Sequence, residues 1–256
     1  MQETKYIHSF DNSKIRYRYS EGNKITLVFV HGGMVNNLCW KYQYDYFKSK
    51  GYGVLALDLR GQGKSTGKIR GNDLHNFAKD IKIVLENEKI SKVILIGHSF
   101  GTLVSLAYYK AYPKRVHALI LLAGSLPTNY SVYSQLKRLF QLYLRVKQAK
   151  KKHSYYESLG KKAYPSKMFH PSLFSLIQNA RAIKKATLSL YKDINVPVLV
   201  IAAQEDEFFS PQEVKKTTEL LSQRTFKILP GPHLFILKEH EKVNNTIENF
   251  LKRNAY

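Results

Sequence analysis

The hydrophobic pattern of the chain consists of short apolar runs separated by stretches with helical periodicity. An alternating segment over 15–19 predicts a half-buried strand. Runs rich in Val, Ile and Leu predict strands that are buried on both faces, at 25–30, 54–57, 93–96, 117–123 and 196–203, and 225–229 predicts a last strand. Because helical stretches separate most of these runs, the pattern predicts an α/β fold with a mostly parallel sheet and helices on both faces.

Apolar residues three and four positions apart predict the intervening helices. The segment 40–50 can form a helix, and Asp73 is a suitable N-cap for a helix over 73–88. A further helix begins at Pro211, and a final helix follows His233. The apolar stripes are Leu74, Phe77, Ile81 and Val84 in the second helix, and Val243, Ile247, Phe250 and Leu251 in the last.

The pattern changes between 126 and 193, where runs typical of buried strands are absent. Two apolar stripes at helical spacing occur here, at Leu136, Leu139, Phe140 and Tyr143, and at Leu173, Leu176, Ile177, Ala180 and Ile183. We interpret residues 126–193 as a helical insertion, called the cap below. The core of the fold is then made of residues 1–125 and 194–256.

One junction between a strand and a helix carries the clearest chemistry. The run 93–96 leads into Gly97-His98-Ser99-Phe100-Gly101, which is followed by an apolar helix. Glycines on both sides let the strand and helix backbones approach around a strained serine. A serine at the start of a helix also has free N–H groups and the positive dipole end beside it, which stabilise an anion. This context favours Ser99 as a nucleophile over a simple helix cap.

A serine hydroxyl needs a base beside it, and the base needs an acid that orients it. His233 follows the last strand, and Asp206 follows the run 196–203. Sites in such sheets form at the carboxyl ends of the strands, where both residues fall. Two alternatives remain: Asp206 lies between two glutamates, as in a solvated acidic turn, and His240 is a second candidate base.

Together and in this order, these motifs resemble the α/β-hydrolases of the serine esterase and monoacylglycerol-lipase-like type. The resemblance covers nearly the whole chain apart from the cap. It implies an α/β-hydrolase fold, with Ser99 as nucleophile, Asp206 as acid and His233 as base. It also implies an oxyanion hole formed by the backbone N–H groups of Gly33 and Phe100, with Met34 as a weaker donor. The motifs are His31-Gly32-Gly33, Asp58-x-Arg60-Gly61-x-Gly63-x-Ser65, the pentapeptide around Ser99, Asp206, and Gly231-Pro232-His233.

At several positions this sequence differs from particular subgroups of the family, and these differences narrow the expected activity. Met34-Val35 stands where proline iminopeptidases have Pro-Gly, which argues against that subgroup. Haloalkane dehalogenases and epoxide hydrolases use an aspartate nucleophile, so Ser99 argues against both. Ala203 replaces a glycine that is usual before the acid, and Pro232 separates Gly231 from the histidine.

The predicted function is therefore a serine hydrolase that cleaves a carboxylic ester through an acyl-enzyme, like carboxylesterases, monoacylglycerol lipases or lysophospholipases. Acyl thioester hydrolysis on the same triad is the nearest alternative, and a non-catalytic binding protein on this fold is an alternative of another class. We expect a pocket for a hydrophobic acyl or aryl group, lined by Met34, Phe140, Tyr143, Leu173 and Phe174. No cluster in the sequence has the spacing of metal ligands, so we expect no metal or cofactor.

The net charge is +22, and its distribution points to possible partners. Fourteen basic residues and two acids lie between 126 and 193, so the cap alone carries +12. Such a surface is either solvated or meets anionic membrane lipids. No motif for specific nucleic-acid binding occurs, and nothing in the sequence indicates the oligomeric state. We therefore expect a small-molecule ester or lipid as substrate.

The first residues, the apolar runs and the single cysteine indicate the cellular compartment. The first residues lack a basic segment leading into an apolar one, so no signal peptide is evident. No apolar run approaches the roughly 20 residues of a membrane-spanning helix. The one cysteine, Cys39, cannot form an internal disulfide, which suits a reducing compartment. We predict a cytoplasmic protein, with peripheral membrane contact as the option that the basic cap raises.

Overall fold

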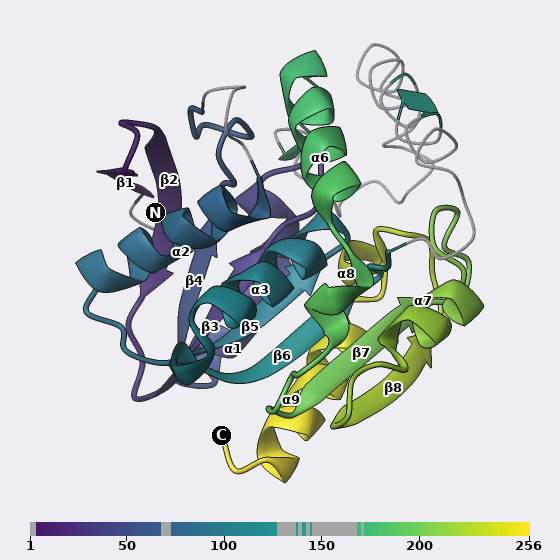
Figure 1. The fold of residues 1–256 in the computed structure, drawn as a ribbon. Helices are drawn as coiled ribbons and strands as arrows, with labels where there is room; N and C mark the ends of the chain where they lie inside the picture. The colour runs from purple at the N-terminus through teal and green to yellow at the C-terminus, as the bar shows by residue number, and fades with distance from the viewer. Residues whose placement is uncertain are drawn as a thin grey trace.

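The computed structural model describes residues 4–67, 73–126 and 172–256, together with residues 137, 140, 141, 144, 168 and 169. In this part of the chain, eight strands form one sheet in the order β1-β2-β4-β3-β5-β6-β7-β8. The first two strands pair antiparallel, and β2 also pairs antiparallel with β4, whereas every other pair is parallel. This arrangement confirms the predicted α/β fold with a mostly parallel sheet (Figure 1).

The strands correspond to the predicted apolar runs, with one addition at the edge. They are β1 (Thr4–His8), β2 (Lys14–Ser20), β3 (Lys24–Val30), β4 (Tyr52–Leu57), β5 (Val93–His98), β6 (Val116–Leu122), β7 (Val198–Ala203) and β8 (Arg224–Leu229). The edge strand β1 was not predicted, because none of its residues is fully buried and it carries no apolar run.

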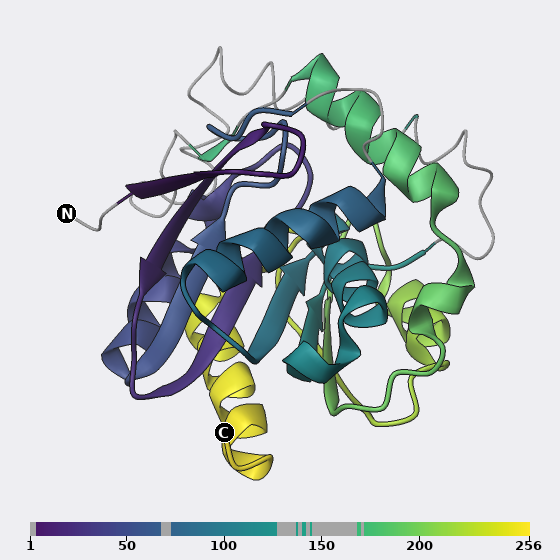
Figure 2. The same ribbon diagram turned by 60° about the vertical axis from the view of Figure 1, so that its left-hand side comes forward.

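Helices cover both faces of the sheet, as Figures 1 and 2 show. The helical segments are η1 (Asn37–Trp40), α1 (Lys41–Ser49), α2 (Leu74–Asn87), α3 (Phe100–Ala111), η2 (Pro113–Arg115), α6 (Leu173–Lys185), η4 (Leu188–Tyr191), α7 (Pro211–Thr218), α8 (Phe235–Lys238) and α9 (His240–Arg253). On one face α2 and α3 pack against the sheet, and on the other α1, α8 and α9 do so.

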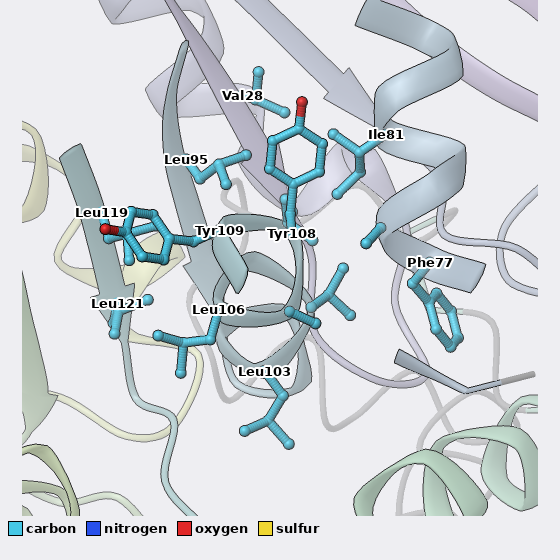
Figure 3. Packing of buried hydrophobic residues seen from close by; sticks show 14 of the residues in the cluster. Val28, Phe77, Ile81, Leu95, Leu103, Leu106, Tyr108, Tyr109, Leu119 and Leu121 are labelled. Atoms are coloured by element: carbon cyan, nitrogen blue, oxygen red, sulfur yellow. The ribbon is translucent and has the colours of Figure 1, made fainter. Parts of the chain in front are cut away.

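Alternation along each central strand divides the core into two layers. Val28 and Val30 of β3 belong to the layer under α2 and α3, whereas Leu27 and Phe29 belong to the layer under α1 and α9. Successive side chains of a strand point to opposite faces, so a strand covered on both sides needs a continuous apolar run. Figure 3 shows the first layer, in which strand residues such as Leu95 and Leu119 meet side chains of α2 and α3.

Helix α6 lies at the carboxyl ends of the strands and not on a face of the sheet. It contacts the turns that follow β3 and β4, with Asn179 against Gly33 and Phe174 against Gly61. The helix falls within the predicted cap, most of whose other residues lie outside the described ranges, including most of its basic residues. Among the helices of the described ranges, none combines the length and hydropathy that crossing a bilayer requires.

The buried face of α6 differs from the one that the apolar stripe suggested. Ile177, Ala180 and Ile183 of that stripe are only half buried. The most buried positions are Ser175, Gln178, Asn179 and Ala182, with Leu176 beside them. The polar side is turned inward because this helix covers polar turns at the strand ends, whereas the other helices cover an apolar sheet.

Candidate active site

Ser99 lies at a sharp turn between β5 and α3. Its backbone has φ 53° and ψ −120°, a conformation that is strained for any residue with a side chain. Two neighbours hold it: the Ser99 N–H donates to the Leu122 carbonyl of β6 at 2.8 Å, and the Ser99 carbonyl accepts from the Thr102 N–H at 3.0 Å and from its hydroxyl at 2.7 Å. The turn therefore presents the serine side chain at its apex.

The two glycines of the pentapeptide are required by close packing. A Cβ on Gly97 would collide with the Gly101 carbonyl, and a Cβ on Gly101 would collide with the Val30 carbonyl of β3. Both clashes are with backbone atoms, which cannot turn aside. Strand β5, helix α3 and strand β3 can thus approach closely only with glycine at these two positions.

Ser99, His233 and Asp206 form a continuous chain of hydrogen bonds. The Ser99 Oγ lies 2.9 Å from His233 Nε2, and His233 Nδ1 lies 2.9 Å from Asp206 Oδ2. The other carboxylate oxygen of Asp206 accepts from the N–H groups of Phe208 and Phe209 at 2.8 and 3.0 Å. The Asp206 side chain is fully buried, so the solvated acidic turn that the sequence allowed is not what the structure has.

The electrostatics of this chain favour a charged acid beside a basic imidazole. Burial alone would raise the pKa of Asp206, but the His233 charge and hydrogen bond, with the two N–H donors, lower that pKa below its usual value. Burial alone would lower the pKa of His233, but the charge and hydrogen bond of Asp206 and the charge of Glu207 raise that pKa above its usual value. The carboxylate therefore stabilises a proton on the imidazole.

The turn after β3 lies directly against Ser99 and brings Gly33 into the site. A Cβ on Gly32 would lie 3.0 Å from the Ser99 Cβ. His31 makes hydrogen bonds with both ring nitrogens: Nε2 accepts from the Leu59 N–H at 2.9 Å, so Nδ1 donates to the Gly32 carbonyl at 2.7 Å. Because a trans peptide is planar, fixing the Gly32 carbonyl also fixes the Gly33 N–H, which points the opposite way.

The two candidate oxyanion donors differ from Met34 in their hydrogen bonds. Among the described residues, no acceptor takes the Gly33 N–H, and Phe100 is the first residue of α3, whose N–H has no partner within its helix. The Met34 N–H donates to Gln62 Oε1 at 3.0 Å. Gly33 and Phe100 are thus better placed than Met34 to bind an anion beside Ser99.

His98 is a neighbour of the site that the sequence did not single out. It is buried beneath the loop of His233, and its Nε2–H donates to the His233 carbonyl at 2.8 Å. Burial, and then the charge of His233, lower the pKa of His98 to about 3, so it stays neutral. A bond across 135 residues has no local sequence signal; the position of His98 beside Ser99 was the available hint.

The other candidate residues are not members of this hydrogen-bonded chain. His240 stacks on Tyr42 with ring centroids 4.2 Å apart, at the start of α9, and is not brought to Ser99. Met34 is buried in the turn after β3, and Phe174 packs on Gly61. Phe140 is 46% exposed. Tyr143 and the side chain of Leu173 lie outside the described residues, and in the described ranges no group of His, Cys, Asp or Glu is arranged to hold a metal ion.

Comparison with known proteins agrees with this architecture. Residues 21–239 match the family model described as "Serine aminopeptidase, S33". The chain is 25% identical over 247 residues to Protein ABHD8 of Bos taurus, covering 89% of this chain and 56% of the relative. It therefore spans about half the length of the ABHD8 relatives that it matches.

Two further similarities extend over nearly the full length of both chains. The chain is 25% identical over 276 residues to the bifunctional esterase/perhydrolase DCH of Acinetobacter calcoaceticus, covering 96% of this chain and 99% of the relative. The solved structure of the esterase EaEST from Exiguobacterium antarcticum superimposes with a TM-score of 0.81 at 24% identity, covering 98% of this chain and all of that one. Because the sequence identity to EaEST is only 24%, this structural similarity shows a shared fold.

Proposed function

We propose, from the premise that this chain belongs to the serine aminopeptidase S33 family of the α/β-hydrolase superfamily, that it is a serine hydrolase cleaving carboxylic esters through an acyl-enzyme. The observation that carries the proposal is the hydrogen-bonded chain from Ser99 through His233 to Asp206. The similarities point to an α/β-hydrolase of the esterase type, and we infer that its substrate is an ester.

In the proposed first half of the reaction, Ser99 attacks the ester carbonyl. His233 Nε2 accepts the hydroxyl proton as the Oγ–carbon bond forms, and Asp206 stabilises the imidazolium. The carbonyl oxygen gains negative charge and accepts hydrogen bonds from the Gly33 and Phe100 N–H groups. His233 then returns the proton to the leaving alkoxide as the carbon–oxygen bond breaks, which leaves an acyl group on Ser99.

The second half repeats these steps with water as the nucleophile. His233 removes a proton from water, the hydroxide adds to the acyl carbonyl, and the same two N–H groups bind the oxyanion. Collapse of this intermediate breaks the bond to Ser99, and His233 protonates the serine oxygen. The products are a carboxylic acid and the free enzyme, and no cofactor takes part.

The turn after β3 favours ester substrates over those of proline iminopeptidases, because Met34-Val35 stands where those enzymes have Pro-Gly. The acids after β7 hold the loop of the proposed base: Asp206 accepts from His233, Glu205 from the Gly231 N–H, and Glu207 from the His233 N–H at 3.1 Å. The anilide assay below tests the choice of ester over peptide directly.

Steady-state hydrolysis of para-nitrophenyl esters of graded chain length tests the proposal. Ser99→Ala should lower kcat by about 10⁴ to 10⁶, because it removes the nucleophile. Adding His233→Ala should cost little more, since the residues act as one unit. The exposed Ser91→Ala is the matched control and should retain full activity. Equal turnover by Ser99→Ala and the wild type would exclude Ser99 as the nucleophile.

Substrate panels separate the alternatives. Matched thioesters and an aminoacyl anilide, assayed beside the esters, rank thioester and peptide cleavage against ester cleavage by kcat/KM. We expect the esters to be cleaved faster than the anilide. If the wild type turns over none of these substrates, the reading as a non-catalytic binding protein is favoured.

A further inference from the structure

A chain of side-chain amides connects the turn that carries Gly33 to helix α6. The Met34 N–H donates to Gln62 Oε1 at 3.0 Å, and Gln62 Nε2 donates to Asn179 Oδ1 at 3.1 Å. Gln62 lies in the turn after β4, 117 residues before Asn179. Three segments that are distant in sequence therefore meet beside the proposed oxyanion hole.

The direction of each bond in this chain is fixed by its first member. A backbone N–H can only donate, so the Gln62 atom that faces Met34 must be the amide oxygen. The Gln62 nitrogen then faces Asn179 and requires an acceptor there, which must be Oδ1. It follows that the remaining polar atom of Asn179, Nδ2, is a donor, and that its orientation does not depend on an arbitrary choice of amide flip.

Asn179 Nδ2 is directed at Gly33 and has no acceptor among the described residues. A Cβ placed on Gly33 would lie 2.6 Å from this nitrogen. Gly33 and Ser99 are each partly exposed, whereas His31, Gly32, Met34 and Phe100 around them are buried. Asn179 itself is only 3% exposed. The donor thus lies beside Gly33, which with Ser99 is one of the partly exposed residues of the site.

Resting on the proposed function, we propose that Asn179 is a specificity-determining residue that donates a hydrogen bond to a substrate oxygen a few atoms from the scissile carbonyl. The favoured substrates are then esters with an ether, hydroxyl or carbonyl oxygen at that place. A hydrocarbon group there would displace water from Nδ2 and leave a buried donor unpaired, which is costly. Sites built to bond a substrate oxygen discriminate against analogues that lack it.

Ester pairs that differ in one atom test this proposal. The acyl pair is para-nitrophenyl butyrate and para-nitrophenyl methoxyacetate, and the alcohol pair is butyl acetate and methoxyethyl acetate, followed by acid release. The quantity is the kcat/KM ratio of oxygen-bearing to hydrocarbon ester, in the wild type and in Asn179→Leu, which has similar shape and no donor. We expect the ratio to fall roughly tenfold in one pair, which identifies the side of the ester that carries the oxygen.

Two further variants separate this role from general damage. Asn179→Asp keeps the acceptor for Gln62 and removes the donor that faces Gly33, so its ratio should fall as well. Gln178→Leu makes the same chemical change one residue earlier, at a side chain that packs against Gly61, and should keep the wild-type ratio. A ratio that falls equally in Gln178→Leu would overturn the proposal.

The remaining outcomes are also decisive. If Asn179→Leu and Asn179→Asp slow all four esters equally, or slow none, Asn179 does not set specificity and this inference is wrong while the proposed function stands. If the wild type cleaves none of the four esters, the proposed function is wrong and this inference is overturned with it.

Discussion

Helices α2 and α6 bury very different side chains. On α2 the buried face consists of Leu74, Phe77, Ala78, Ile81, Val84 and Leu85, with one acid, Asp80. On α6 it includes Ser175, Gln178 and Asn179 beside Leu176 and Ala182. The apolar pattern of α2 therefore coincides with its buried face, whereas that of α6 does not. The difference follows from what each helix covers, an apolar sheet or the polar turns at the strand ends.

The buried polar groups of the two helices also differ in their partners. Asp80 accepts from Arg60 Nε and Nη2, both at 2.6 Å, and from the Ser9 hydroxyl at 2.5 Å. On α6 both polar atoms of Gln178 are buried and have no hydrogen-bond partner among the described residues, and there Asn179 bonds only through its oxygen. Polar groups buried this way lower stability. We interpret α2 as part of the framework and α6 as a helix on which Asn179 keeps one donor ready for a ligand.

The largest expected effect on stability is at Asp80. Asp80→Ala leaves the Arg60 guanidinium, 1% exposed, without its main partner, and should lower the free energy of unfolding by about 3–5 kcal/mol. Asp80→Asn keeps an acceptor and should cost less. Urea denaturation measures both. A loss below about 1 kcal/mol in Asp80→Ala would show that the pair is not part of the stabilising framework.

On α6 we expect a substitution of a buried polar side chain to increase stability, in contrast to Asp80→Ala on α2. Gln178→Leu replaces an unpartnered buried amide with an apolar group of similar size, and should raise the free energy of unfolding by about 1 kcal/mol. The same denaturation experiment applies, with Ile81→Val on α2 as a control that should lose about 0.5–1.5 kcal/mol. Destabilisation by Gln178→Leu would mean that this amide has a partner in solution, and the contrast between the helices would weaken.

The smallest effect concerns pH. In the proposed mechanism His233 acts as a base in its neutral form, so kcat/KM should rise as pH increases through the pKa of His233. Burial lowers this pKa, but the charges of Asp206 and Glu207 raise it above the usual value for histidine. Glu207→Gln removes one of these charges and keeps an acceptor for the His233 N–H. The acidic limb of the pH profile should therefore move to lower pH, and a shift to higher pH would contradict this electrostatic account.

Strands buried on both faces could be predicted from the sequence because their side chains must be apolar at every position. The run before Ser99 became β5, and the runs before Asp206 and His233 became β7 and β8. The carboxyl ends of parallel strands meet at one edge, so residues that follow such runs come together although they are distant in sequence. For this reason the sequence could place Ser99, His233 and Asp206 near one another.

Contacts that depend on a specific pair of loops could not be predicted in the same way. The bond from His98 to the His233 carbonyl and the bond from Gln62 to Asn179 join residues more than 100 positions apart. Neither pair leaves a periodic signal. The buried face of α6 was also missed, because an apolar stripe identifies a buried face only where the helix packs on an apolar surface.

Labelling with a fluorophosphonate tests the central claim, that Ser99 is a nucleophile activated by His233, most directly. Intact-mass spectrometry should show one adduct per chain, and peptide mapping should locate it on Ser99. The adduct should be absent in Ser99→Ala, form far more slowly in His233→Ala, and form normally in Ser91→Ala. An unlabelled wild type, under conditions that label a reference serine hydrolase, or an adduct on a different residue would contradict the claim.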